Sequence, residues 1–287
     1  MSRENTVILY GYLNEKPKIF VDQQTHEYVL ARLTVHTVRR RIRKELKLLG
    51  RNIYDDILIR TKDKEIIKFI IKNELDKGDM VFVKGMLTTV PSIKKHTCPK
   101  CGFVNKKIGA TTVCIDPIFI GPWEQGNEKL ERETTNIQEE SAQTILDSKY
   151  EISNMIFIWG YLCRDPDYYE SPDFRKRECQ FQIASDRKRR IDYSDEKTDY
   201  PWVRVYGEQA EEASHVLKTG SEIYINGSLQ SRDIRKKMEC QDCHYIFETG
   251  DYGVDIVPYS IEYGRNCDFS SLDEDKEEDD FIGEKEE

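Results

Sequence analysis

Two stretches of the sequence repeat each other: residues 5–17 read NTVILYGYLNEKP and residues 154–166 read NMIFIWGYLCRDP. They share an Asn, a Gly-Tyr-Leu and a Pro at an offset of 149 (154 − 5). Further on, residues 75–87 read LDKGDMVFVKGML and residues 217–229 read LKTGSEIYINGSL, at an offset of 142 (217 − 75). The matches keep their order and the offset changes little, so the chain is predicted to contain one domain twice.

Both halves show the same order of strand and helix patterns. In the first, alternating apolar residues predict strands at about 5–13, 27–40, 53–60, 79–89 and 111–120, and a helix at about 63–75. In the second, the corresponding strands are at about 154–163, 176–189, 200–206, 221–231 and 252–261, and the helix is at about 208–218. Five strands with one short helix before the fourth are typical of the OB-fold, a five-stranded Greek-key barrel. The predicted fold is therefore all-β, with two tandem OB-folds.

Charge divides the chain into four parts. Residues 1–121, the first OB-fold, carry 23 Lys+Arg against 13 Asp+Glu, and residues 122–153 form an acidic linker. Residues 154–267, the second OB-fold, carry 16 Lys+Arg against 21 Asp+Glu. Residues 268–287 carry 2 against 11, so this acidic C-terminal tail is expected to be disordered. The net charge of −9 therefore hides a basic first domain.

The sequence has no membrane or export pattern. No stretch approaches the roughly 18 apolar residues of a membrane helix, so no membrane association is expected. The N-terminus enters a strand pattern directly, without a secretion signal. These features predict a cytoplasmic location, where cysteines stay reduced and a Cys-x-x-Cys pair indicates metal or redox chemistry.

Such a pair occurs once in each repeat. Residues 94–101 read KKHTCPKC and residues 236–243 read KKMECQDC, each between the fourth and fifth predicted strands. Structural zinc takes four ligands, and one pair supplies only two thiolates. We therefore predict one composite structural Zn²⁺ site that ties the two loops together. Its ligands would be Cys98, Cys101, Cys240 and Cys243.

Other interpretations of the cysteine pairs stay open at this point. Two separate zinc sites would need Cys114 or His96 in the first repeat, and His244 with carboxylates in the second. A redox pair usually comes with a βαβ setting, which the pattern lacks. The run CQDCH at residues 240–244 matches the c-type haem attachment motif, but no export signal accompanies it.

Basic and aromatic residues gather where an OB-fold can bind nucleic acid. Single strands are held by cations along the phosphates and by aromatic side chains that stack on bases. Strand alternation puts Tyr200, Trp202, Arg204 and Tyr206 on one face, with Val203 and its neighbours on the other. The candidate nucleic-acid-binding residues are Arg39, Arg40, Arg41, Arg43, Tyr54, Arg60, Arg187, Arg189, Tyr200, Trp202, Arg204, Tyr206 and Arg232.

One aromatic pair is ambiguous. Tyr10 and Trp159 occupy equivalent places in the first strand of each repeat. Either they stack on bases or they pack the two barrels together, and packing is the favoured interpretation.

The second repeat resembles the bacterial single-stranded DNA-binding protein family. The resemblance rests on TDYPWVRVYGEQAEEASHVLKTGSEIYINGSLQSR (198–232), which follows the family's pattern of an aromatic strand, aromatic-Gly-x-x-Ala-Glu, Leu-x-x-Gly and Gly-x-Leu-x-x-Arg. The first repeat matches less well, with Arg60 and Thr61 where the second has Tyr206 and Gly207. The cysteine insert departs from the family. So does the tail, where GEKEE follows the family-like EEDDFI (277–282). Two barrels in one chain suggest a homodimer that presents four.

These observations favour a binding protein over an enzyme. The chain lacks a Walker phosphate loop, His-Glu-x-x-His and Gly-x-Ser-x-Gly. The predicted function is binding of single-stranded DNA without strong sequence preference, in DNA replication, recombination or transfer, with the acidic tail recruiting replication or transfer proteins. The alternative is an OB-fold protein-interaction scaffold in a replication or conjugation complex. RNA stays open as a ligand, because stacking tolerates any base.

Overall fold

The computed structural model describes residues 4–39, 54–121, 150–173, 175–191 and 194–270. The first repeat contains β1 (Asn5–Leu13), β2 (Lys18–Val21), β3 (Tyr28–Val38), β4 (Tyr54–Thr61), α2 (Lys64–Lys72), β5 (Met80–Thr97) and β6 (Val104–Gly121). The second contains α4 (Tyr150–Ser153), β7 (Asn154–Leu162), β8 (Asp167–Glu170), β9 (Arg177–Asp186), β10 (Thr198–Asp199), β11 (Trp202–Tyr206), α5 (Glu208–Val216), β12 (Glu222–Glu239) and β13 (Ile246–Tyr263). The predicted strands and helices are all present, and the short β2, β8 and β10 are additional.

Each repeat closes into a barrel by the same pairings. In the first, β1 pairs with β3 and β5, β5 pairs with β6, and β4 pairs with β6 in parallel. In the second, β7, β9, β12, β13 and β11 repeat these pairings. Apolar side chains fill the barrels, among them Leu33 and Phe181. The prediction of two tandem OB-folds is confirmed.

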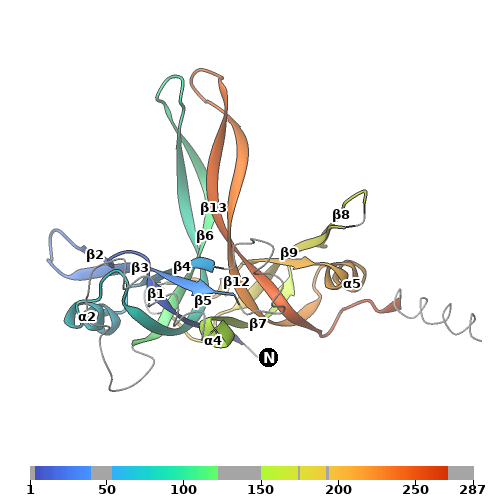
Figure 1. Ribbon diagram of the computed structural model, residues 1–287, viewed down its shortest axis with the longest axis horizontal. Helices are drawn as coiled ribbons and strands as arrows, with labels where there is room; N and C mark the ends of the chain where they lie inside the picture. The colour runs from blue at the N-terminus through green and yellow to red at the C-terminus, as the bar shows by residue number, and fades with distance from the viewer. Residues whose placement is uncertain (1–3, 40–53, 122–149, 174, 192–193, 271–287) are drawn as a thin grey trace, which may run out of the picture.

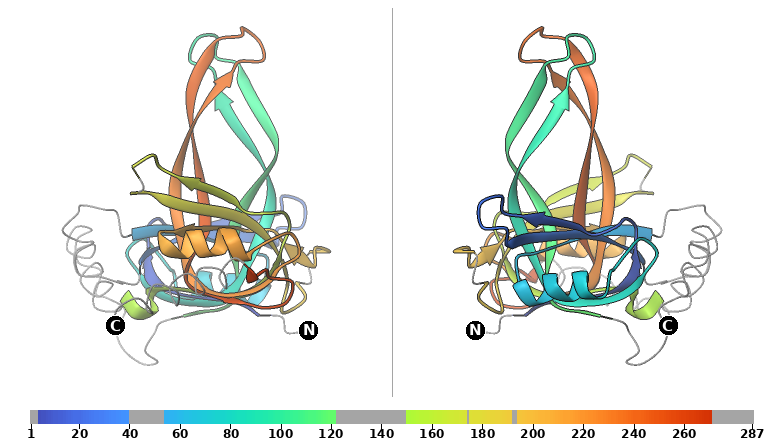
Figure 2. Two further views of the ribbon diagram at one scale, coloured as in Figure 1. Left: turned by 90° about the vertical axis from the view of Figure 1, so that its right-hand side faces the viewer. Right: turned by 90° about the vertical axis from the view of Figure 1, so that its left-hand side faces the viewer.

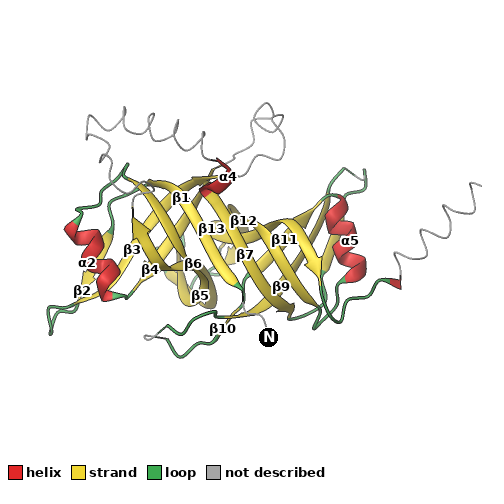
Figure 3. Ribbon diagram, turned by 90° about the horizontal axis from the view of Figure 1, so that it is seen from below, coloured by secondary structure: helices red, strands yellow, loops and turns green. Residues whose placement is uncertain are grey.

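The two barrels share one sheet (Figures 1 and 3). Strand β1 pairs antiparallel with β7, so the described strands form a single 13-stranded sheet. Val7 lies opposite Ile156, its own counterpart at the offset of 149. A strand that pairs antiparallel with its own copy places an approximate two-fold axis between the repeats.

The matched asparagines of the opening stretches support this arrangement. The Asn5 side chain donates to the Leu87 carbonyl (3.0 Å) and accepts from the Leu87 N–H (2.9 Å). Asn154 makes the same two bonds to Leu229 (2.7 and 2.9 Å). Both side chains are buried, so each amide satisfies backbone groups that water cannot reach. These bonds account for the asparagine that both repeats carry at this position.

Tyr10 and Trp159 are not equivalent in their surroundings. Tyr10 is buried, and its carbonyl accepts a hydrogen bond from the Ser153 hydroxyl in α4. Trp159 is partly exposed, lies 5.9 Å from the Tyr224 ring and donates to Glu222 (3.2 Å). Packing therefore accounts for Tyr10, and α4 shows that the end of the predicted linker lies against the first repeat.

The fourth and fifth strands are much longer than predicted. Each of β5, β6, β12 and β13 has 18 residues. Their outer parts leave the barrels as two hairpins that stand side by side (Figures 1 and 2). We call residues 91–111 the first arm and residues 233–253 the second arm. The cysteine pairs therefore lie at the tips of long hairpins and not in barrel loops.

The pairing register corrects one match between the repeats. Ile59 pairs with Ile115 in the first barrel, and Val203 pairs with Ile256 in the second. The structural offset on this strand is therefore 144 (203 − 59), so Arg60 corresponds to Arg204 and not to Tyr206. The helix starts agree, because α2 begins at residue 64 and α5 at residue 208.

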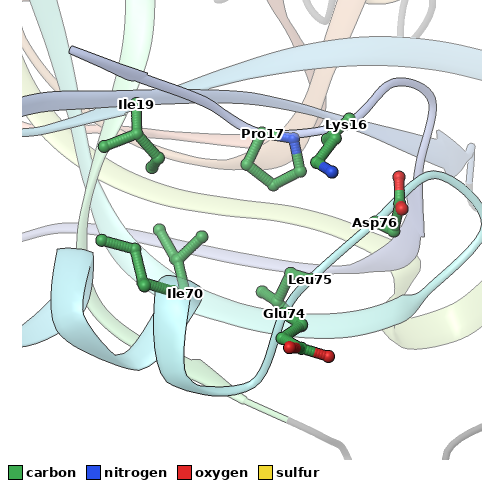
Figure 4. Close-up of a pocket in the computed structure, with 8 residues that line it drawn as sticks. Lys16, Pro17, Ile19, Ile70, Glu74, Leu75 and Asp76 are labelled. Atoms are coloured by element: carbon green, nitrogen blue, oxygen red, sulfur yellow. The ribbon is translucent and has the colours of Figure 1, made fainter.

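A pocket of about 530 Å³ lies between β2 and α2 (Figure 4). Pro17, Ile19, Ile70 and Leu75 line it, and Lys16 and two carboxylates stand around them. The lining has no row of aromatic and cationic side chains. It also lies at the end of the first repeat, away from the arms, so it is not the candidate site (Figure 1).

Candidate nucleic-acid interface and metal centre

The four predicted cysteine ligands meet where the tips of the arms come together. The sulfur atoms of Cys98, Cys101, Cys240 and Cys243 all lie within 4.8 Å of one another. Two of the separations join the two arms: Cys98 Sγ lies 3.7 Å from Cys243 Sγ, and Cys101 Sγ lies 3.6 Å from Cys240 Sγ. Sulfurs at about 2.3 Å from a tetrahedral zinc would be about 3.8 Å apart. The four cysteines thus come together as predicted, and their spacing fits a metal of this kind.

Matching turns hold the sulfurs in place. The Cys98 N–H donates to the Phe103 carbonyl (2.8 Å), and the Cys240 N–H donates to the Tyr245 carbonyl (3.0 Å). Gly102 and His244 both have positive φ, 76° and 56°, which lets each chain turn around the cluster. The buried Asn105 amide accepts from the Gln241 N–H (2.8 Å) and so ties the two turns together.

The residues of the rival two-site interpretation are engaged elsewhere. His244 bonds Glu239 (2.7 Å), and His96 Nδ1 bonds the Thr249 hydroxyl. Cys114 lies in the barrel against Thr88, where burial raises the pKa of its thiol. Among the described residues, these side chains do not come together as ligands of two separate sites.

The cluster contains thiols of very different acidity. Burial disfavours the Cys240 thiolate, but hydrogen bonds from the backbone N–H groups of Cys243 and Asp242 outweigh it and lower the Cys240 pKa to about 6. The Phe103 backbone favours the Cys101 thiolate. Burial and the three neighbouring cysteines outweigh that effect and raise the Cys101 pKa to about 12. A bound metal cation would neutralise the thiolates and so remove the effect of each cysteine on the ionisation of the next.

Polar contacts join the arms below their tips. Lys94 of the first arm forms an ion pair with Asp251 of the second, which also pairs with Lys236 (3.0 Å). Nearer the barrels, the Tyr252 hydroxyl donates to the Asp56 carbonyl (2.7 Å). The arms are therefore connected along their length as well as at the cysteines.

Two buried aspartates form equivalent latches between the repeats. Asp55 accepts from Arg39 (2.6 and 2.7 Å) and from the N–H and hydroxyl of Ser231 in the other repeat (2.7 and 2.9 Å). Asp199 accepts from Arg187 (2.7 and 2.9 Å) and from the N–H and hydroxyl of Thr89 (2.7 and 3.2 Å).

The latches correct the predicted roles of two arginines. The Arg187 side chain is only 5% exposed, and its hydrogen bonds to Asp199 raise the Arg187 pKa above its ordinary value. The Arg39 side chain is 25% exposed, and its Nε and Nη2 donate to the two carboxylate oxygens of Asp55. Both were predicted to contact phosphate, but in this structure they are internal ion-pair partners. The sequence alone does not show which carboxylates pair with these arginines.

The second repeat presents the aromatic face that alternation predicts. Val203 and Val205 are buried, Trp202 and Arg204 are half-buried, and Tyr206 is exposed. Tyr200 is exposed just before β11.

A cation lies beside this aromatic row, and a further tyrosine continues it. The Arg164 guanidinium lies 4.7 Å from the centre of the Trp202 ring. The pairing of β8, β9 and β11 puts Tyr169 and Glu178 in one row with Tyr206. Tyr169 was not predicted, because its four-residue strand gives too short an alternation to read.

The arginines of this face are largely paired. Arg204 forms ion pairs with Glu178 and Asp255 (3.2 Å to Asp255), and Arg232 pairs with the same Asp255. Arg189 reaches the first repeat, where it bonds Asp116 (2.8 Å). Most of the basic side chains predicted for the second repeat therefore have their charge neutralised by ion pairs with carboxylates.

In the first repeat the face is less aromatic. Tyr54 stacks on His36 with 5.3 Å between ring centres. Arg60 is half-buried on the same strand, and no described carboxylate forms an ion pair with it. Arg40, Arg41 and Arg43 lie outside the described residues.

Comparison with known proteins gives a family for the second repeat and a fold for the chain. Residues 153–245 match the Single-strand binding protein family, a family of binding proteins and not of enzymes. No curated protein sequence matches the chain. No helix in the described residues has the length and apolar character to span a membrane.

Solved structures of the single-stranded DNA-binding protein from Thermus aquaticus have a similar fold. The wild-type structure is 17% identical, with a TM-score of 0.56 over 92% of this chain and 95% of that one. A deletion mutant of that protein is 18% identical, with a TM-score of 0.54 over 92% and 96%. The second repeat thus matches the family that its sequence resembles, and the chain shares the fold of a bacterial single-stranded DNA-binding protein.

Proposed function

We propose that this protein binds single-stranded DNA without strong sequence preference. The observation that carries the proposal is the aromatic row of exposed Tyr200 and Tyr206 and half-buried Trp202, with Arg164 against Trp202, in a repeat that matches the Single-strand binding protein family. Aromatic faces accept any base, and nearby cations hold the backbone. The Thermus aquaticus proteins of similar fold are single-stranded DNA-binding proteins by description, which supports the same ligand here.

The proposed setting is DNA replication, recombination or transfer in the cytoplasm. Residues 268–287, with 11 acidic residues against 2 basic ones, would recruit partner proteins. Residues 268–270 are the described part of this tail, and the Asp268 N–H donates to the Val216 carbonyl (2.8 Å). The rest of the tail lies outside the described residues.

Zinc is the metal proposed for the cysteine cluster. Cys98, Cys101, Cys240 and Cys243 would hold it, because four thiolates in a closed set are typical of structural zinc. When bound, the ion would neutralise the thiolates and join the two arms at their tips. The turns at Gly102 and His244 and the Asn105 bridge would orient the ligands.

A homodimer is proposed on the outer face of the shared sheet. Ile8, Phe82 and Phe157 are half-buried there on neighbouring strands, on the side away from the barrel cores. Pairing of two such faces would cover apolar area and present four barrels. Sedimentation analysis would show twice the chain mass, and a monomer at micromolar concentration would exclude this assembly.

The alternative function, a protein-interaction scaffold, rests on the neutralised face of the second repeat. There Glu178 and Asp255 pair with the arginines that would otherwise hold phosphate. A scaffold would show little affinity for single strands at any salt concentration.

Fluorescence anisotropy of labelled oligo(dT) at two salt concentrations separates the two functions. A single-stranded DNA-binding protein should bind tightly, and its affinity should fall steeply with rising salt, because the release of counterions on binding becomes less favourable. Duplex DNA of equal length should bind more weakly. Absence of any preference for the single strand at low salt would refute the proposal and favour the scaffold.

A further inference from the structure

The four cysteines at the tips of the arms form two symmetric pairs. Cys98 Sγ lies 3.7 Å from Cys243 Sγ, and Cys101 Sγ lies 3.6 Å from Cys240 Sγ, so each pair joins one arm to the other. The offset of 142 between the arms (240 − 98 and 243 − 101) matches Cys98 with Cys240 and Cys101 with Cys243. It therefore converts one pair into the other, and the duplication places the same thiol contact at the tips twice.

Each pair combines a buried sulfur with one that a small oxidant can reach. Cys98 and Cys240 are 1% and 0% exposed. Their neighbours across the arms differ, because Cys101 is exposed and Cys243 is partly exposed. In such a pair the accessible thiol reacts first, and the buried thiol lies beside the product.

Protein contacts hold the two pairs in place in addition to any bound metal. The Asn105 side chain accepts from the Gln241 N–H (2.8 Å) and donates to the Cys240 sulfur (3.8 Å). Below the tips, Lys94 forms an ion pair with Asp251. The arms stand side by side in perpendicular views (Figures 1 and 2). The sulfurs of the two arms therefore face each other because of the fold itself.

We infer that these pairs are a reversible oxidation site, at which a peroxide joins the two arms by the disulfides Cys101–Cys240 and Cys98–Cys243. This inference rests on the proposed zinc site and adds a second chemical state to it. A disulfide brings two sulfurs to about 2.0 Å, so the pair at 3.6 Å closes when the tips shift by about 1.6 Å. The arms then stay joined by covalent bonds in place of a shared metal.

The chemistry of each pair balances with one peroxide. The thiolate of the accessible cysteine attacks a peroxide oxygen, the O–O bond breaks, a sulfenic acid forms and hydroxide leaves. The thiolate of the buried cysteine then attacks the sulfenic sulfur, the S–S bond forms and a second hydroxide leaves. The two sulfurs lose two electrons, the peroxide gains them, and the two thiol protons convert both hydroxides to water. Either disulfide removes two of the four thiolates, so a bound zinc ion would be released.

The competing product is a disulfide within one Cys-x-x-Cys turn. It would join Cys98 to Cys101, or Cys240 to Cys243, and would leave the arms unlinked. The contacts at 3.6 and 3.7 Å both run between the arms, which favours the cross-linked product. A dithiol reductant returns either product to thiols by exchange, so the site is reversible.

Trypsin separates these products, because Lys100 lies between the two cysteines of the first arm. Cleavage gives the peptides HTCPK, with Cys98, and CGFVNK, with Cys101. Residues 238–265 have no internal Lys or Arg, so both cysteines of the second arm stay in one long peptide. A disulfide between the arms joins a short peptide to the long one, whereas a disulfide within the first arm joins the two short peptides.

The test treats the zinc-loaded full-length chain with hydrogen peroxide, alkylates it and maps the unreduced tryptic peptides by tandem mass spectrometry. Both short peptides should be linked to the long one, with Cys101 on Cys240 and Cys98 on Cys243. A chelating dye should record the loss of one zinc ion per chain, and a dithiol should remove both links. Non-reducing electrophoresis should show the mass of a single chain. After chelation, the oxidised chain should melt at a higher temperature than the reduced chain, because disulfides constrain the unfolded state.

Two serine variants locate the reactive thiols. Cys101→Ser should keep the link between HTCPK and the long peptide and lose the other link. Cys163→Ser removes an exposed thiol outside the cluster and should keep both links.

The outcomes separate this inference from the zinc site. Disulfides confined to single turns, links between different chains, or sulfinic acids without any link between the arms would each overturn the inference and leave the zinc site standing. Loss of both links in Cys163→Ser would overturn it too, because oxidation would then begin outside the cluster. A purified chain without zinc refutes the proposed metal, and the peptide map of that chain still decides whether the disulfides join the arms.

Discussion

Replacing Asp199 with Asn should destabilise the protein more than any other single change in the latches. The carboxylate accepts four hydrogen bonds, two from Arg187 and two from Thr89 of the other repeat. The variant leaves the Arg187 charge buried and unpaired, which costs about 3–5 kcal/mol. Asp55→Asn should cost less, about 1–3 kcal/mol, because Arg39 is 25% exposed and water reaches its guanidinium.

Urea unfolding followed by circular dichroism measures the loss. With a slope of about 3 kcal/mol per M, the midpoint for Asp199→Asn should fall by about 1 M or more. Asp195→Asn, a change at an exposed residue just before β10, is the matched control and should leave the midpoint unchanged. Adding Arg187→Met to Asp199→Asn should restore much of the loss, because no unpaired charge remains.

Two results would refute this reasoning. If Asp199→Asn unfolds at the same urea concentration as Asp195→Asn, the latch does not stabilise the fold. If the double variant lowers the salt slope of DNA binding by about 0.7, Arg187 contacts phosphate after all and is not an internal partner.

Three further predictions concern the aromatic face and the cysteines. Trp202→Ala should weaken oligo(dT) binding by about 1–3 kcal/mol in anisotropy without changing the salt slope, because stacking releases no counterions; a changed slope would contradict this. Cys101→Ser should lower the zinc content measured by mass spectrometry, whereas Cys163→Ser, an exposed thiol outside the cluster, should keep one ion per chain. Zinc affinity should rise with pH through neutrality, because Cys240 with a pKa of about 6 is already ionised there but Cys101 with a pKa of about 12 must release its proton on binding. Calorimetry in two buffers would then show proton release, and its absence would exclude thiolate binding.

The sequence predicts the features that repeat and those that alternate. The duplication, the barrels and the two faces of β11 follow from local patterns, which neighbouring residues set. The composite cysteine site also follows, because each repeat supplies half of a four-ligand set.

Other features depend on pairings that no local pattern encodes. The outer parts of the long strands escaped prediction because their apolar residues are too few to alternate along each strand. Two of those in the second arm, Met238 and Phe247, gather instead at the cysteine cluster. The latch aspartates find their second partners through the β1–β7 pairing, which brings Thr89 beside Asp199 and Ser231 beside Asp55. The match of Arg60 with Tyr206 fails by two residues, since only the strand register shows which positions coincide.

The symmetry between the repeats separates structure from function. Residues that hold the repeats together are the same type in both, as with Asp55 and Asp199. Surface positions differ instead. At the offset of 144 that aligns β4 with β11, Tyr200, Trp202 and Tyr206 of the second repeat correspond to Asp56, Leu58 and Lys62 of the first.

This asymmetry implies a division of the binding free energy. The second repeat carries the stacking face and neutralises its arginines. In the first repeat, Lys95, Lys106 and Lys107 of the arm are exposed and form no ion pair with a described carboxylate, and the equivalent face has fewer aromatic side chains. Stacking is insensitive to salt, and phosphate contacts are strongly sensitive. Changes in the first arm should therefore alter the salt slope, and changes on β11 should alter the affinity at every salt concentration. A single strand held this way must contact both repeats, which is why the arms, the latches and the shared sheet have to fix one repeat against the other.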